Sequence, residues 1–192
     1  MSDFLLTQII NYGAPIVGIT VLLGAIGIPM PGTLTVVAAG AFSSQGILSW
    51  PATALIGLVC AVTGDSISYA MGYYARGPVL KRFSGTSAWA QAEQYFQRWG
   101  GMSVFLSRFL VTAIAIPVNL LAGTGDFTYK RFIVFDIAGE TVWILGFGGL
   151  GYLFSNQWEL VGEFLSNFGG LTLGIVILGV GIWLAIRWIK KQ

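Results

Sequence analysis

Four stretches of predominantly apolar residues dominate the sequence, at residues 4–28, 50–74, 131–154 and 168–189. Each is long enough to cross a membrane as a helix, which takes about 20 such residues. Only 9% of all residues are charged, whereas a soluble domain carries roughly a quarter. The sequence therefore predicts an all-α polytopic membrane protein, in which residues 1–192 form a single membrane domain.

Two shorter apolar segments, residues 29–46 and 102–124, are interrupted by prolines, glycines and polar residues. Irregular backbone survives at membrane depth only where it is buried in protein or lines a cavity. The first segment is too short to span, which predicts a re-entrant hairpin. The second predicts either one crossing or another hairpin. The residues that we expect to shape the backbone of these hairpins are Pro29, Pro31, Gly32, Pro117 and Gly123.

The positions of the basic residues favour one topology. Lys and Arg gather in cytoplasmic loops, and both flanks of residues 102–124 are basic, which favours a hairpin over a crossing. The sequence thus predicts four transmembrane helices and two re-entrant hairpins that enter from opposite faces, with both termini in the cytoplasm. The residues behind this prediction are Arg76, Lys81, Arg82, Lys130, Arg131, Arg187, Lys190 and Lys191.

The predicted elements fall into two related halves, about residues 1–75 and 101–192. A hairpin followed by a span occurs twice in opposite orientation, an inverted repeat typical of secondary transporters, which bind substrate where the repeats meet. Residues 76–100 connect the halves on the cytoplasmic side. Within this connection, residues 88–99 alternate aromatic and polar side chains at helical spacing, which predicts an amphipathic helix at the membrane interface.

Four ionisable residues lie in apolar surroundings: Asp65, Arg108, Asp136 and Glu140. Placing a charge at the centre of a membrane costs at least about 2.5–3.5 kcal/mol, so a functional role is the first hypothesis. The arginine offers a bidentate fork to a phosphate or carboxylate, and the three acids are candidates for proton uptake in a cavity. Further candidates for substrate binding are Tyr69, Thr112 and Asn119.

Two structural alternatives stand beside this hypothesis. Arg108 and either Asp65 or Glu140 form a buried pair that only stabilises the fold, or Asp136 pairs with Arg131 near the membrane surface. The chain has no histidine and one cysteine, so no metal site, no cofactor and no enzymatic activity is expected. A net charge of +2 gives no reason to expect nucleic acid as a partner.

Several short motifs, in order along the chain, resemble those of the DedA family, also called the SNARE-associated or VTT-domain family. The resemblance covers roughly residues 20–155 and rests on PMPG at residues 29–32, AG at 39–40, GDSISY at 64–69 with Gly72, SRFL at 107–110, PVNLLAG at 117–123, KRF at 130–132, GE at 139–140 and GY at 151–152. The family arginine corresponds to Arg108 and the family aspartate to Asp65. The glutamate that many members carry near the first hairpin has no counterpart here.

The resemblance implies a protein of the bacterial inner membrane that moves lipids between leaflets, with two opposed re-entrant hairpins. We therefore expect a lipid translocase that binds the phosphate headgroup of a phospholipid or of undecaprenyl phosphate, with coupling to the proton gradient. An ion-coupled transporter of a small solute is the alternative. Faces of small residues on the second and fourth predicted spans fit either internal packing or a homodimer.

Overall fold

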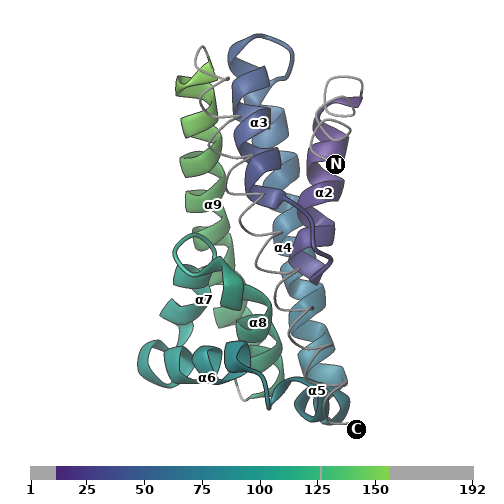
Figure 1. Cartoon of the computed structure of the whole chain (residues 1–192), viewed down its shortest axis with the longest axis vertical. Helices are drawn as coiled ribbons and strands as arrows, with labels where there is room; N and C mark the ends of the chain where they lie inside the picture. The colour runs from purple at the N-terminus through teal and green to yellow at the C-terminus, as the bar shows by residue number, and fades with distance from the viewer. Residues whose placement is uncertain (1–11, 126, 156–192) are drawn as a thin grey trace, which may run out of the picture. The chain divides into compact units, whose positions relative to one another are not determined.

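The computed structural model describes residues 12–125 and 127–155, and this part of the chain is all helical. The predicted fourth span at residues 168–189, both chain termini and the basic residues beyond 155 lie outside the described residues. The elements, in chain order (Figure 1), are α2 (Ala14–Ile26), α3 (Gly32–Ser44), α4 (Trp50–Tyr74), α5 (Arg76–Phe83), α6 (Ser87–Trp99), α7 (Gly101–Ser107), the 3-10 helix η1 (Thr112–Ile114), α8 (Ala115–Thr124) and α9 (Tyr129–Leu153).

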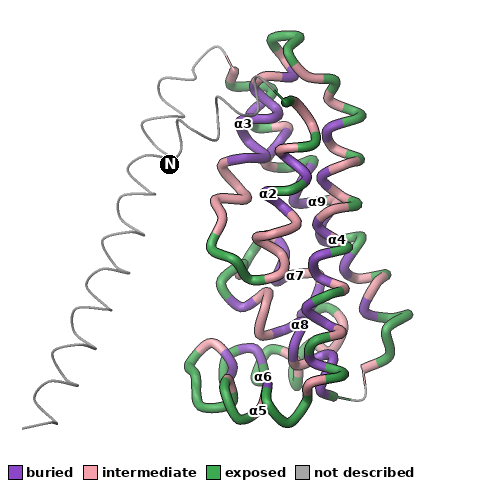
Figure 2. Tube along the Cα trace, turned by 90° about the vertical axis from the view of Figure 1, so that its right-hand side faces the viewer, coloured by how far each residue is buried: buried purple, intermediate pink, exposed green. Residues whose placement is uncertain are grey.

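Two of the predicted spans, α4 and α9, are confirmed as long apolar helices of 25 residues each. At 1.5 Å per residue each is about 37 Å long, more than the roughly 30 Å of a membrane's hydrocarbon core. One side of each helix is buried and the other is exposed (Figure 2). The exposed side carries large apolar residues such as Leu55, Val59, Val134 and Leu145, which suits contact with lipid.

The predicted span at residues 4–28 is wrong in the part that the structure describes. Gly13 adopts a φ of 64°, in the left-handed region that favours glycine, and α2 begins only after it. A Cβ placed on Gly13 would lie 3.5 Å from Leu48, beyond the end of α3. The start of α2 and the end of α3 therefore lie together, so these helices are the two arms of one hairpin. This first hairpin covers residues 14–44 rather than 29–46.

The second hairpin consists of α7, η1 and α8, in the segment for which the sequence predicts either one crossing or a hairpin. A Cβ placed on Gly101, at the start of α7, would lie 3.0 Å from Phe127, which follows α8. Both ends of the segment are therefore at the same end of the bundle, and the chain turns back at residues 108–111. A single crossing would have separated these ends by the length of a span.

Each hairpin packs against both long helices. In the first hairpin α2 packs on α4 and α3 on α9, whereas in the second α7 packs on α9 and α8 on α4. Glycines allow these close approaches: Gly72 faces the carbonyl of Leu120, and Gly123 faces that of Tyr69. The small-residue face of α4 thus serves internal packing, while the corresponding face of the predicted fourth span lies outside the described residues.

The helix predicted at residues 88–99 is confirmed as α6, and its place at the membrane interface stays a prediction. Its N-cap residue Thr86 accepts a hydrogen bond from the backbone N–H of Trp89, and this bond fixes the first turn. Trp89 and Ala92 are buried, whereas Gln91 and Glu93 are exposed. The helix packs on α7 and α8, so it supports the second hairpin from the side of the basic residues.

Candidate functional site

Arg108 occupies the tip of the second hairpin, immediately after α7, and only 3% of its surface is exposed. Its aliphatic stem fits because Gly139 has no side chain: a Cβ there would lie 2.6 Å from Cγ of Arg108. The guanidinium carbon lies 5.8 Å from the centre of the Phe132 ring, a cation–π distance. The arginine side chain is therefore fixed by packing against its neighbours and is not a mobile surface charge.

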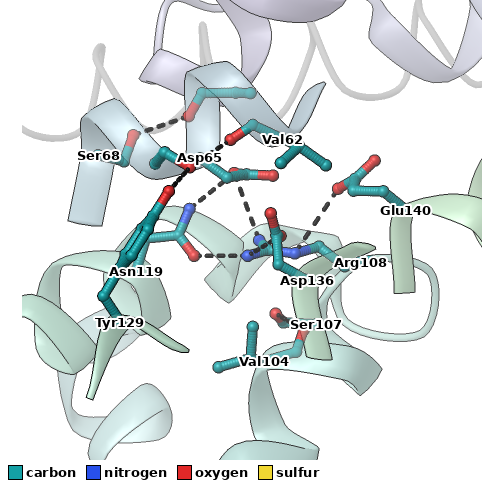
Figure 3. Close-up of polar contacts among 12 residues, drawn as sticks. Val62, Asp65, Ser68, Val104, Ser107, Arg108, Asn119, Tyr129, Asp136 and Glu140 are labelled. Atoms are coloured by element: carbon teal, nitrogen blue, oxygen red, sulfur yellow. Dashed lines mark hydrogen bonds and ion pairs between the residues drawn. The ribbon is translucent and has the colours of Figure 1, made fainter. Parts of the chain in front are cut away.

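Three carboxylates surround this guanidinium (Figure 3). Arg108 Nη2 lies 2.7 Å from Asp136 Oδ1, Nη1 lies 3.4 Å from Asp65 Oδ1, and Nε lies 3.6 Å from Glu140 Oε1. All three acids are buried. The group of these four residues is called the charge cluster below. One guanidinium faces three carboxylates, so the cluster has a formal charge of −2 when every member is ionised.

Asn119 connects the arginine to one of these acids. Arg108 Nη2 donates to Asn119 Oδ1 at 2.7 Å, and Asn119 Nδ2 donates to Asp65 Oδ1 at 2.7 Å (Figure 3). The amide is fully buried, and it comes from α8, whereas Asp65 comes from α4. This relay ties the second hairpin to the first long helix, as expected for a buried polar network in which each member orients the next.

Several polar atoms of the cluster lack a hydrogen-bond partner in the described part of the chain. They are Asp65 Oδ2, Arg108 Nε and Nη1, and both carboxylate oxygens of Asp136. The 2.7 Å contact between Arg108 and Asp136 is thus an ion pair by distance, without hydrogen-bond geometry. Buried polar atoms are nearly always partnered in native proteins, so the cluster has capacity to bind a further polar group or protons.

The three carboxylates also satisfy the first requirement for a cation site, because one oxygen from each lies within 4.8 Å of the others. Oxygen clusters of this kind bind hard cations such as Ca²⁺ and Mg²⁺. Here, however, the guanidinium of Arg108 lies 2.7–3.6 Å from the same acids. The space that a metal ion requires already contains a cationic group, so the donor set fits arginine better than a metal.

A cavity of about 250 Å³ lies beside the charge cluster, where the two hairpin tips meet. The first hairpin contributes Met30, Gly32 and Thr33, and the second contributes Thr112 and Ile116 together with Arg108. Asp65 of α4 and the pair Glu140 and Trp143 of α9 complete the wall. All four main parts of the bundle thus contribute to one cavity, and its polar side is the charge cluster.

The structure brings together most of the residues proposed from the sequence. Asp65, Asp136, Glu140 and Asn119 all meet at Arg108. The alternative pairing of Asp136 with Arg131 is wrong, because Asp136 is fully buried and its ion pair is with Arg108. The guanidinium of Arg108 faces three carboxylates of the chain itself, and its binding of a substrate phosphate stays a prediction.

Tyr69 is the one proposed substrate contact that lies elsewhere. It shares a helix face with Asp65, but its hydroxyl donates to the backbone carbonyl of Phe127 at 2.7 Å. It lines a separate groove of about 700 Å³, together with Tyr73, Tyr74 and Tyr129. Tyr69 therefore stabilises the junction of α4 with the loop before α9 and does not face the central cavity.

The residues expected to shape the hairpins take different places. Pro29 and Pro31 lie in the turn of the first hairpin, and Gly32 follows in the cavity wall. Pro117 lies in the first turn of α8, where a missing N–H breaks no helical bond. Sequence reasoning did not assign Trp143, Thr33 or Met30 to the site. Trp143 could have been found, because it follows Glu140 by three residues and so shares its helix face.

Comparison with known proteins gives a consistent result. The sequence model of the VTT domain matches residues 28–153. An uncharacterized membrane protein of Synechocystis is 29% identical over 189 residues, which cover 95% of this chain and 85% of that protein. One from Mycobacterium tuberculosis is 32% identical over 89% of this chain and 80% of its own length. Protein DedA of Escherichia coli is 25% identical over 79% of this chain and 69% of its own length. No solved structure matches significantly.

Proposed function

The chain belongs to the VTT-domain family of membrane proteins, also called the DedA family, and from this premise we propose that it is a lipid translocase of the bacterial inner membrane. Its substrate is a phospholipid or undecaprenyl phosphate, which it moves between leaflets without chemical change. The observation that carries this proposal is the charge cluster, buried at the meeting point of two hairpins inside an apolar bundle.

The proposed membrane arrangement follows from helix lengths. α4 and α9 span the bilayer, whereas α2, α3, α7 and α8 have 13, 13, 7 and 10 residues and are too short to do so. They form two re-entrant hairpins that enter from opposite faces and meet at the cavity. In each half, the first arm of the hairpin packs on the long helix of its own half and the second arm packs on the long helix of the other half. This matching pattern supports an inverted repeat. The basic end of α9, at Lys130 and Arg131, faces the cytoplasm.

In this arrangement the charge cluster lies at membrane depth, where ionisable residues are rare and usually functional. The polar headgroup enters the cavity between the hairpin tips while the acyl or prenyl tails remain in the bilayer. The cavity offers the headgroup the polar surroundings that the hydrocarbon core lacks, which lowers the barrier for crossing.

In this mechanism protons bind to the carboxylates that face Arg108. The groups that face Arg108 are Asp65 from α4 and Asp136 and Glu140 from α9, and within the described residues no ionisable side chain reaches the cluster from the first hairpin. Three carboxylates with one guanidinium repel an anionic headgroup, and protonation of one carboxylate reduces that repulsion. We therefore expect exchange of an anionic lipid to accelerate as the pH falls, with coupling to the proton gradient as its consequence.

An ion-coupled transporter of a small solute is the second candidate, and the size of the cavity is compatible with it. A volume of about 250 Å³ lies just below the roughly 300–1,000 Å³ of pockets for drug-sized ligands. Such a cavity holds either a lipid headgroup or a small solute. Uptake of a solute into liposomes at a rate independent of lipid composition supports this candidate over the translocase.

The test of the proposal is leaflet exchange in proteoliposomes. Fluorescent phosphatidylglycerol in both leaflets is quenched from outside with dithionite, and further quenching reports lipid that arrives from the inner leaflet. We expect exchange with the wild type and its loss in Arg108→Ala. In the nearly isosteric Asp65→Asn, which is neutral at every pH, we expect the acceleration of exchange at low pH to be reduced. Lys81→Gln, an exposed charge on α5, is the matched control and keeps the wild-type rate. Unchanged exchange in both cluster variants refutes the mechanism.

A further inference from the structure

We propose that the phosphate group of the ligand is held by the N-terminal turn of α3 together with the indole N–H of Trp143, in the cavity that Arg108 also lines. The ligand class that follows is a phosphodiester, which carries one negative charge. This inference rests on the proposed function, because it specifies how that same cavity receives the headgroup.

The first observation is the open N-terminus of α3. Its N-cap residue Pro31 forms no side-chain cap, and its first turn contains no acidic residue. The N–H of Gly32 bonds to the carbonyl of Met30, and the first helical bond runs from Thr35 to Pro31. The N–H groups of Thr33 and Leu34 are therefore free within the described residues. They form the positive end of the helix dipole, which binds anions.

The second observation is independent of the helix end. Trp143 is 8% exposed, and its Nε1 is buried without a hydrogen-bond partner in the described part of the chain. The indole lies against the start of α3: its Cη2 and Cζ2 atoms are 3.8 and 3.9 Å from the position of a Cβ on Gly32. Both residues line the same cavity. A buried indole N–H needs an acceptor, and an anion at the α3 terminus supplies one.

The charge cluster explains why the anion is not held by Arg108. Three carboxylates already enclose the guanidinium, so its side of the cavity carries excess negative charge. The donors from α3 and Trp143 are uncharged N–H groups together with roughly half an elementary charge from the helix dipole. These donors, called the seat below, offset part of one negative charge. A phosphomonoester carries up to two, and beside three carboxylates its second charge is repelled.

The experiment uses the full chain in detergent micelles with ¹⁵N-labelled indoles. The chain has seven tryptophans, and Trp143→Phe identifies the Trp143 signal by its loss. The probes are dihexanoyl phosphatidylglycerol as the phosphodiester, dihexanoyl phosphatidic acid as the phosphomonoester, and inorganic phosphate as the free anion. We expect the Trp143 signal to shift strongly with the phosphodiester and weakly with the phosphomonoester. A shift with inorganic phosphate at the same concentration assigns the seat to a free anion and overturns the assignment to a lipid headgroup.

Binding measurements with matched variants complete the test. Loss of one hydrogen bond to a charged group lowers affinity by about tenfold or more, so we expect this loss for phosphatidylglycerol with Trp143→Phe. Trp99→Phe, at an exposed indole on α6, leaves the affinity unchanged. Thr33→Glu places a carboxylate at the helix end and blocks the seat, whereas Thr33→Gln does not.

The outcomes separate this inference from the proposed function. If wild-type protein exchanges lipid in an Arg108-dependent manner but Trp143→Phe binds phosphatidylglycerol normally and the Trp143 signal does not shift, the seat is overturned and the translocase stands. If the wild type exchanges no lipid, the translocase fails, and a Trp143 signal that shifts with phosphatidylglycerol still supports the seat.

Discussion

The tips of the two hairpins meet at the same cavity but contribute different chemistry to it. Residues 27–31 of the first tip include no ionisable side chain, and Thr33 and Leu34 beyond them offer backbone N–H groups. The second tip carries Arg108, which contacts three acids. The arms, in contrast, are held alike, by glycines that face the backbone of the neighbouring helix. The two hairpins thus pack in the same way, but the first contributes backbone N–H groups to the site and the second contributes a charged side chain.

The largest difference between the two tips is expected when the charged side chain of the second tip is removed. Arg108→Ala leaves three buried carboxylates without a cation, and we expect it to lower the free energy of unfolding by about 3–5 kcal/mol. Met30→Ala in the uncharged tip removes a half-buried side chain and costs about 1 kcal/mol. Denaturation in micelles measures both. Equal losses at the two tips would contradict the division of roles.

The shared packing of the arms predicts equal sensitivity in the two hairpins. Gly40 in the first faces the carbonyl of Gly148, and Gly123 in the second faces that of Tyr69. Because backbone cannot move aside, we expect Gly40→Ala and Gly123→Ala each to cost about 1–3 kcal/mol. Gly149 is the control, because no described atom lies within 4 Å of the position that an added methyl group would take, and Gly149→Ala is neutral or stabilising. Sensitivity of one hairpin alone would show that the arms are held differently.

Asn119 sharpens the comparison, since the first tip has no equivalent relay among the described residues. Asn119→Leu removes a partner from both Arg108 and Asp65, and leaving such groups unpaired costs about 1–3 kcal/mol. We expect a lower denaturation midpoint with secondary structure unchanged by circular dichroism. Wild-type stability in this variant would mean that the relay contributes nothing to the attachment of α8 to α4.

The smallest expected effect concerns the threonines beside the two tips. Thr33 and Thr112 line the cavity, and neither side chain forms a hydrogen bond within the described part of the chain. Thr33→Val and Thr112→Val should each change the free energy of unfolding by no more than about 0.5 kcal/mol. A larger loss at either position, measured by the same denaturation, would reveal a structural contact at that tip.

The long helices and the members of the charge cluster were predictable because each has a strong local signal. Twenty-five apolar residues indicate a span wherever they occur, and an ionisable residue such as Asp65 or Arg108 is conspicuous in apolar surroundings. The sequence could not show that Arg108 is enclosed by all three acids, because α4, α9 and the second hairpin supply them from distant positions. Neither could it show the free N–H of Trp143, which depends on what packs around the ring.

The error in the first hairpin has a simple cause. Residues 4–28 are apolar enough on average to predict one span, although Asn11, Gly13 and Pro15 interrupt the run locally. The break lies at Gly13, whose φ of 64° is not revealed by the mean hydropathy of the whole run. Tyr69 is a similar case, because sharing a helix face with Asp65 does not fix where a long side chain ends.

The most direct test of the central claim, that the charge cluster works in transport and does not merely hold the fold, is leaflet exchange by the double variant Arg108→Gln, Asp136→Asn. Two carboxylates remain in it without the guanidinium, so the formal charge of the cluster stays at −2, and the closest buried pair is replaced by neutral groups of similar shape. We predict that this protein recovers stability relative to Arg108→Gln but still fails to exchange phosphatidylglycerol in proteoliposomes. Recovery of wild-type exchange together with stability would show that the arginine serves only the fold, and would contradict the account.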